Sequence, residues 1–242
     1  MQSSNKTAHD GKTNRTGLAM SPHAEEMLEV TMMTVQSTNQ GALQKEQAHY
    51  LKAAHALGSI PPPDTAKGKM KAAWEAVKGN KASVFVDKLA ERLAFERTGT
   101  RLYDAMLAKM RVEKKFPDGP TLKAVTQIRD EEQAHAQMLA DTIEQLGADP
   151  TAMTPSADLV GVEGMGLGKV LNDPRTTVGQ CLHALIIAEL ADNEGWTMLR
   201  TLAEEMGQNA LAKRFTQAEE DEQRHLEQVR AWREAYTKAE AT

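Results

Sequence analysis

Two stretches of the sequence carry one pattern: Glu131-Glu132-Gln133-Ala134-His135 and Asp221-Glu222-Gln223-Arg224-His225. Each places a glutamate three residues before a histidine and an acid directly before that glutamate. Residues three apart share a face of an α-helix, so each Glu–His pair can point at the same place. Both stretches interrupt apolar patterns of helical period, and those longer patterns predict the fold.

Four long segments without internal proline contain the apolar patterns. In each segment apolar residues recur at alternating steps of three and four, as on a helix face that is buried in a bundle. Gly147 is expected to end the second helix, and Gly207 separates the third from the fourth. The sequence therefore predicts an all-α fold with helices at about 83–113, 121–146, 176–206 and 208–239.

The connections between these segments predict the topology. The first and last connections are short, so each joins an antiparallel helical hairpin. The middle connection, 148–174, is long and contains Gly161, Gly164, Gly166 and Gly168 as well as three prolines. We expect it to be a flexible crossover along the bundle. Two hairpins joined by one long crossover form a four-helix bundle.

Acids and histidines interrupt each apolar stripe near its middle. A carboxylate buried without a partner costs several kcal/mol, so such groups are protonated, paired or bound to metal. One Glu from each of two helices, with Glu-x-x-His from each of two others, is a ligand set for two metal ions. Carboxylate oxygen and imidazole nitrogen favour two iron ions, and manganese also suits them. The predicted ligands are Glu96, Glu132, His135, Glu189, Glu222 and His225.

Three further acids are expected to support these ligands. Glu131 and Asp221 precede the motif glutamates, and each can accept the outer N–H of the histidine on the opposite helix. This predicts the pairs Glu131–His225 and Asp221–His135. Asp192, three residues after Glu189, also points inward. It is an additional ligand, an acceptor for a ligand, or the partner of another buried polar group.

The quoted motifs resemble the ferritin-like di-iron carboxylate superfamily, which includes bacterioferritins and rubrerythrins. The resemblance covers about residues 83–239 and implies a ferritin-like four-helix bundle with two irons that react with O2 or peroxide. It also implies a role for Tyr103, seven residues after Glu96, because relatives carry a tyrosine near the metals for hydrogen bonding or one-electron donation. The segment before residue 83 has no counterpart in ferritins, and the chain has no rubredoxin module.

The resemblance implies an oxidoreductase that oxidises Fe(II) with O2 or H2O2. The sequence does not identify an organic substrate or the electron donor, and a homodimer is compatible with it. One alternative is iron storage or sequestration in an assembly. A second alternative is a metal-free bundle that acts as a stress-related scaffold.

The chain before the bundle divides into two parts. Residues 1–20 predict a disordered tail, and residues 21–82 a helical extension with a linker rich in proline and lysine; residues 83–242 form the bundle. Glu46-Gln47-Ala48-His49 repeats the Glu-x-x-His spacing, but Lys45 precedes it in place of an acid. We interpret this copy as a solvated helix face.

Composition excludes several classes of protein. A net charge of -5 argues against nucleic acid as a partner. The first 20 residues lack the apolar stretch of a signal peptide, and no window approaches the roughly 20 apolar residues of a membrane span. These features predict a cytoplasmic protein without a membrane partner. The single cysteine excludes an intrachain disulfide and a Cys-pair metal site.

Four other polar or aromatic residues lie near the expected centre in sequence. We expect Trp196 to pack in the core, His183 to lie in the core or at the surface near the bundle end, and Glu194 and Glu219 to face outward or line the rim. Cys181 is expected to be a small apolar residue.

Overall fold

The computed structural model describes residues 44–45, 48 and 81–242. In 81–242 the chain is all-α and contains no strand, which confirms the predicted fold class. The helices are α4 (Lys81–Met110), α5 (Leu122–Gln145), α6 (Pro155–Asn172), α7 (Val178–Glu205) and α8 (Asn209–Glu240). The predicted tail 1–20, nearly all of the extension 21–82, and His49 lie outside the described residues. No helix of the described part combines the length and apolar character that a membrane span requires.

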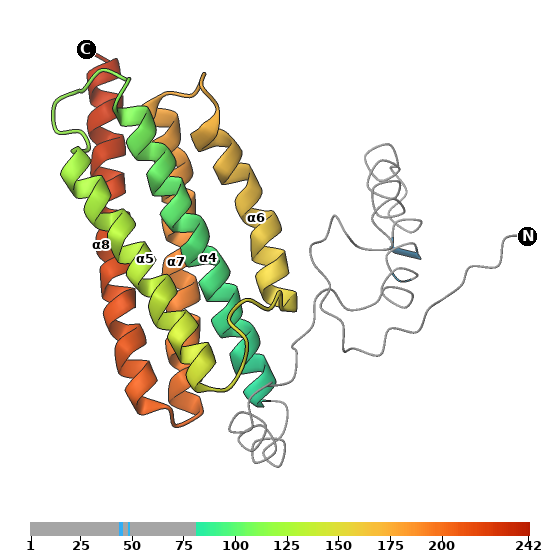
Figure 1. Ribbon diagram of the computed structural model, residues 1–242. Coiled ribbons are helices and arrows are strands. Elements are labelled where there is room, and N and C mark those ends of the chain that lie inside the picture. Colours follow the sequence, from blue (N-terminus) through green and yellow to red (C-terminus); the bar gives the residue numbers. More distant parts are fainter. Residues whose placement is uncertain (1–43, 46–47, 49–80) are drawn as a thin grey trace, which may run out of the picture.

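Four of the helices, α4, α5, α7 and α8, pack side by side along their length (Figure 1). α4 and α5 form one antiparallel hairpin, and α7 and α8 form the other. α4 also packs against α7, and α5 contacts α8, so the two hairpins close around a common interior.

Local signals fix the ends of these helices. Thr121 and Thr177 cap the first turns of α5 and α7, where each side chain accepts a backbone N–H that has no partner within the helix. Gly147 and Gly207 follow α5 and α7 with positive φ angles of 85° and 69°. In this left-handed conformation a glycine closes a helix without steric penalty. Both glycines therefore act as the sequence predicted.

The crossover differs from the flexible connection that its glycines predicted, because residues 155–172 form the helix α6. Thr154 caps this helix, and Pro155 stands in its first turn, where no N–H is needed. Figure 1 shows α6 beside α4 and α7, returning the chain along the bundle. Ser156 anchors its start, since its hydroxyl donates to Asp87 Oδ2 over 2.6 Å. Packing on α4 thus outweighs the cost of about 0.5–1 kcal/mol for each helical glycine.

The interior of the bundle consists of two apolar clusters. One cluster contains Tyr103, Leu182 and Val229, and the other contains Leu89 and Phe215. The buried glutamates and histidines belong to neither cluster and lie on the same helices between their members. The bundle therefore has a polar layer between two apolar halves.

Candidate metal centre

The polar layer contains one glutamate from each of the four long helices. Glu96 comes from α4, Glu132 from α5, Glu189 from α7 and Glu222 from α8. Their exposed fractions are 0%, 1%, 2% and 0%. Because water does not reach these carboxyl groups, protons, cations or donors inside the bundle must compensate them.

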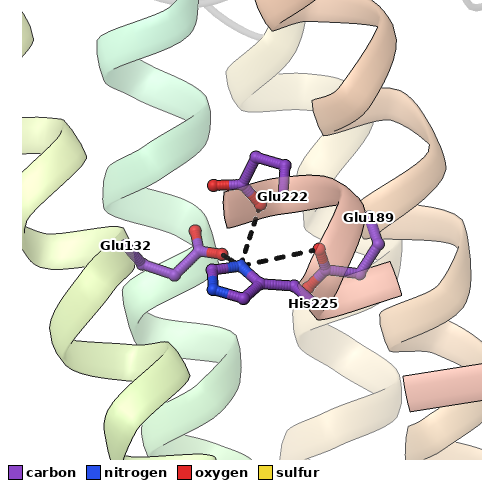
Figure 2. A group of neighbouring side chains, drawn as sticks. All are labelled: Glu132, Glu189, Glu222 and His225. Carbon is purple, nitrogen blue, oxygen red and sulfur yellow. Dashed lines mark hydrogen bonds and ion pairs between the residues drawn. The ribbon is translucent and has the colours of Figure 1, made fainter. Parts of the chain in front are cut away.

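Three of the glutamates surround His225 (Figure 2). His225 Nδ1 lies 3.0 Å from Glu222 Oε2, 3.6 Å from Glu132 Oε1 and 4.0 Å from Glu189 Oε2. One possible ligand atom from each of the four residues lies within 4.8 Å of the others. Three carboxylate oxygens and one ring nitrogen thus converge on one place that could hold a metal ion.

A second group forms around His135. Its Nδ1 lies 2.7 Å from Glu222 Oε1 and 3.5 Å from Glu96 Oε2. None of these three buried atoms makes a hydrogen bond of good geometry, so all three converge on a place that a cation could occupy. Glu222 belongs to both groups, because one of its oxygens faces each histidine. The arrangement therefore offers two adjacent metal positions that share Glu222.

Carboxylates on the neighbouring helix orient both histidines from outside. His225 Nε2 lies 2.7 Å from Glu131 Oε2, and His135 Nε2 lies 3.6 Å from Asp221 Oδ2. Arg224 joins the two acids, at 2.9 Å from Glu131 Oε2 and 2.7 Å from Asp221 Oδ1. These are the pairings that the sequence predicted. They turn each Nδ1 toward the centre, as outer partners do for histidines that bind metal.

Two buried aromatic residues, one on α4 and one on α7, each donate a hydrogen bond to the glutamate of the other helix. The Tyr103 hydroxyl donates to Glu189 Oε1, and Trp196 Nε1–H donates to Glu96 Oε1 over 2.8 Å. Burial and the neighbouring charge of Glu189 raise the pKa of Tyr103 well above its usual value, so the phenol keeps its proton. The prediction of a packing role for Trp196 was incomplete. Its ring packs against Phe215, but the indole N–H also positions Glu96.

Arg92 is a buried residue of the centre that the sequence reasoning missed. Its Nη1 lies 3.2 Å from Asp192 Oδ1 and donates to the Asp192 carbonyl oxygen over 3.2 Å, while its Nε lies 3.5 Å from Glu96 Oε1. Asp192 points inward, as predicted, and pairs with this arginine. The one sequence signal was the position of Arg92 four residues before Glu96, which places both on one face of α4.

Gly99 leaves room for the Glu132 carboxylate. A Cβ atom at position 99 would lie 2.0 Å from Glu132 Oε2, closer than any side chain tolerates. Gly99 therefore lets Glu132 reach across to α4, and it shapes the centre without contributing a ligand.

Burial and mutual charge shift the pKa values of the central groups in opposite directions. Burial and the nearby Glu222 carboxylate raise the pKa of Glu132 to about 8. Burial would also raise the pKa of Glu222, but His135 and His225 outweigh it and lower that pKa to about 2. For both histidines burial favours the neutral ring, but the surrounding glutamates raise the pKa of His135 to about 10 and that of His225 to about 12. Without metal, two imidazolium ions thus supply the positive charge that the centre requires.

The donor set fits divalent cations. Several buried carboxylate oxygens have no hydrogen-bond partner, and each such acceptor costs about 1–3 kcal/mol unless a cation or a donor reaches it. Four carboxylates and two imidazoles neutralise and coordinate two divalent ions, so metal binding would remove this cost. The oxygens without a hydrogen bond are Glu96 Oε2, Glu132 Oε2, Glu189 Oε2, Asp192 Oδ1 and Glu222 Oε1. Of these, Asp192 Oδ1 and Glu222 Oε1 lie within ion-pair distance of Arg92 Nη1 and His135 Nδ1.

The other residues that the sequence analysis considered lie away from these groups. His183 and Glu194 are exposed, and Cys181 is buried. Glu219 is half-buried and accepts hydrogen bonds from Thr197 and Arg200, each over 2.6 Å. None of the four belongs to either group of converging ligand atoms.

Comparisons of the chain with protein-family models, curated proteins and solved structures found no match. Inferences about function therefore rest on the centre and its geometry.

Proposed function

We propose that this chain is a ferritin-like di-iron protein that binds two Fe(II) ions in the bundle interior and oxidises them with O2 or H2O2. The convergence of two buried groups of metal-ligand atoms that share Glu222 carries this proposal. The connectivity supports it as well, since two hairpins joined by a crossover are typical of ferritin-like bundles.

The six predicted ligands would divide between the two positions. Glu96 and His135 would hold one ion, and Glu189 and His225 would hold the other. Glu222 lies between the histidines and would bind both ions, with Glu132 beside it. Because all four helices contribute, metal binding would also tie the two hairpins together.

Iron is the metal we propose, because carboxylate oxygens and imidazole nitrogens suit Fe(II), as they also suit Mn(II). Oxidation of two Fe(II) ions to Fe(III) releases two electrons, which with two protons convert O2 to H2O2, or H2O2 to two water molecules. Tyr103 would keep Glu189 in place through its hydrogen bond and would donate one electron, with loss of the phenolic proton once the ring is oxidised. The buried position of the centre would keep bulk water from it.

Anaerobic Fe(II) loading of the purified full chain, followed by O2 and then by peroxide, tests the proposal. We expect two equivalents of iron per chain and oxidation of both after one of the oxidants is added. Absence of stoichiometric metal would favour the scaffold alternative. Many irons per chain in a large particle would favour storage.

The double variant Glu132→Ala/Glu222→Ala tests the assignment of the ligands. It removes the two carboxylates that lie between the two positions, so we expect it to bind no stoichiometric iron. Two equivalents of iron in this variant would contradict the assignment, even if the unaltered chain oxidises Fe(II).

A further inference from the structure

A third group of converging ligand atoms lies beside the two already described. It consists of Glu96, Glu132 and Asp192, all buried, with one oxygen of each within 4.8 Å of the others. Asp192 Oδ1 and Glu132 Oε2 have no hydrogen-bond partner. By its atoms alone, this group could hold one more cation.

Arg92 stands at this third group. Its side chain is buried, with an exposed fraction of 6%, and within the described residues it forms ion pairs with Asp192 and Glu96. The distances of 3.2 Å to Asp192 Oδ1 and 3.5 Å to Glu96 Oε1 are those of ion pairs. A positive charge of the protein therefore already lies between these carboxylates.

The fold makes room for this guanidinium. A Cβ atom at position 195 would lie 1.7 Å from Arg92 Nη1, so Gly195 leaves space on α7 for the guanidinium in its observed position. On α4, the guanidinium carbon lies 4.3 Å from the centre of the Phe95 ring, where the cation is further stabilised. Gly195 and Phe95 thus both accommodate the Arg92 guanidinium.

The charges of the centre balance when Arg92 is included. The buried acids Glu96, Glu132, Glu189, Asp192 and Glu222 carry five negative charges when ionised. Two divalent ions and one guanidinium carry five positive charges. With Arg92 in place, a third divalent ion would bring two charges that no acid of the layer compensates.

We propose that Arg92 is a built-in cation that takes the place of a third metal ion at Glu96, Glu132 and Asp192, and so limits the centre to two metal ions. This inference rests on the proposed two-metal centre and adds to it the residue that sets its stoichiometry. Asp192 is then a partner of Arg92 in the two-metal protein. It becomes a metal ligand only when the arginine charge is removed.

The positions on α7 that correspond to Arg92 and Gly99 on α4 support this role of Arg92. The residue four before Glu189 is Leu185, where α4 has Arg92 before Glu96. The residue three after Glu96 is Gly99, where α7 has Asp192 after Glu189. The centre thus has one additional arginine and one additional acid, which contact each other.

Mn2+ binding to full-length variants tests the inference. Equilibrium dialysis with Mn2+ alone should give two equivalents per chain for the unaltered protein and three for Arg92→Met and Arg92→Gln. Arg92→Lys retains the positive charge and should keep two equivalents. Arg92→Met/Asp192→Asn lacks both the arginine and the third ligand, so it should also bind two.

The outcomes separate this inference from the proposed function. If the unaltered chain binds no Mn2+ and no Fe2+, the proposed centre itself is wrong. If it binds two ions and both neutral Arg92 variants also bind two, the centre stands and the role of Arg92 is overturned. Loss of metal from Arg92→Met/Asp192→Asn, in a variant that melts like the unaltered chain, would show that Asp192 is an ordinary ligand and would also overturn the inference.

Discussion

The half of the centre around Glu96 and His135 and the half around Glu189 and His225 follow one plan. In each half a glutamate and a histidine from the two helices of one hairpin lie close to Glu222. An acid on the neighbouring helix holds the outer nitrogen of each histidine. Each half thus combines its own glutamate and histidine with Glu222, and Glu132 joins the half around His225.

The surroundings of the two halves differ. Glu189 accepts a hydrogen bond from the Tyr103 hydroxyl, whereas Glu96 accepts one from the Trp196 indole and lies beside Arg92. A phenol can exchange a proton and an electron, while the guanidinium adds a fixed positive charge. Two related ligand sets can therefore have different chemistry, because the residues that contact the ligand glutamates differ.

Loss of Glu222 should have the largest effect, since this residue serves both halves. We expect Glu222→Ala to bind neither metal ion, because each position loses an oxygen ligand. Metal analysis after anaerobic loading measures this. Glu220→Ala, which alters an exposed acid on the same helix, should retain both ions. Two bound ions in Glu222→Ala would show that the halves do not share this residue.

Removal of one histidine should separate the halves. His135→Ala and His225→Ala should each lower the metal content from two equivalents to one, because each ring faces only one position. His183→Ala, an exposed substitution, is the matched control. His49→Ala should also leave the content unchanged, as the sequence predicts. A loss in the His49 variant would show that the N-terminal motif was misinterpreted.

Acid should weaken both halves together. Each histidine must release a proton before Nδ1 binds metal, since the carboxylates raise the pKa of His135 to about 10 and that of His225 to about 12 in the metal-free chain. Release of these two protons alone raises the overall affinity for two ions about 100-fold per pH unit between pH 6 and 8. Glu132, whose pKa is raised to about 8, must also lose its proton, which makes the rise steeper below pH 8. Calorimetry in buffers of different ionisation enthalpy counts the protons, and absence of proton release would contradict the prediction.

The raised pKa values of the two histidines also determine the direction in which the stability of the metal-free protein changes with pH. Contacts of the imidazolium ions with the glutamates stabilise the fold fully below the ordinary histidine pKa of about 6.5. This contribution is lost as the pH rises through 10 and then 12. Denaturation of metal-free protein over this range measures the loss.

Substitution of the two aromatic donors tests the difference between the halves directly. Tyr103→Phe and Trp196→Phe each remove one hydrogen bond to a buried carboxylate, which is worth about 1.5–3 kcal/mol. We expect both variants to bind two ions. Only Tyr103→Phe should slow Fe(II) oxidation, by about tenfold or more, because phenylalanine cannot exchange a proton or an electron. Equal rates in stopped-flow oxidation would remove the proposed role of Tyr103.

A methyl group at Gly99 should have the smallest effect. Gly99→Ala forces Glu132 to move, because the new Cβ would lie 2.0 Å from Glu132 Oε2. Such overpacking costs about 1–3 kcal/mol, so the melting temperature should fall and metal binding weaken. Gly161→Ala on α6 meets no atom within 4 Å and should instead stabilise the helix by about 0.5–1 kcal/mol. Unchanged metal affinity in Gly99→Ala would show that Glu132 can shift away from the new Cβ atom and still bind metal.

The sequence predicted the long helices well because their signals are local. The apolar spacing together with Gly147 and Gly207 placed the ends of α5 and α7 within a few residues. It failed for α6, where four glycines oppose a helix and contacts with α4 outweigh them. Local propensity cannot report a contact with a helix more than 60 residues away, such as that between Ser156 and Asp87.

The inward position of all six predicted ligands followed from helical period, since residues three and four apart share a face. Arg92 and Trp196 did not follow in this way, because their partners lie 100 residues away and on another helix. An arginine on a helix is ordinarily solvated, and a tryptophan on an apolar stripe ordinarily only packs. Their contacts appear only when α4 and α7 lie side by side.

Sequence alone therefore established the four long helices, the level of the polar layer and the residues that face inward, because one repeating geometry governs each helix. The packing of the helices established which oxygen faces which nitrogen, that Glu222 serves both histidines, and that Arg92 stands at the third group of acids. The physical reason is range: helical period acts over a few residues, whereas a buried charge responds to every group that the fold brings within a few ångströms.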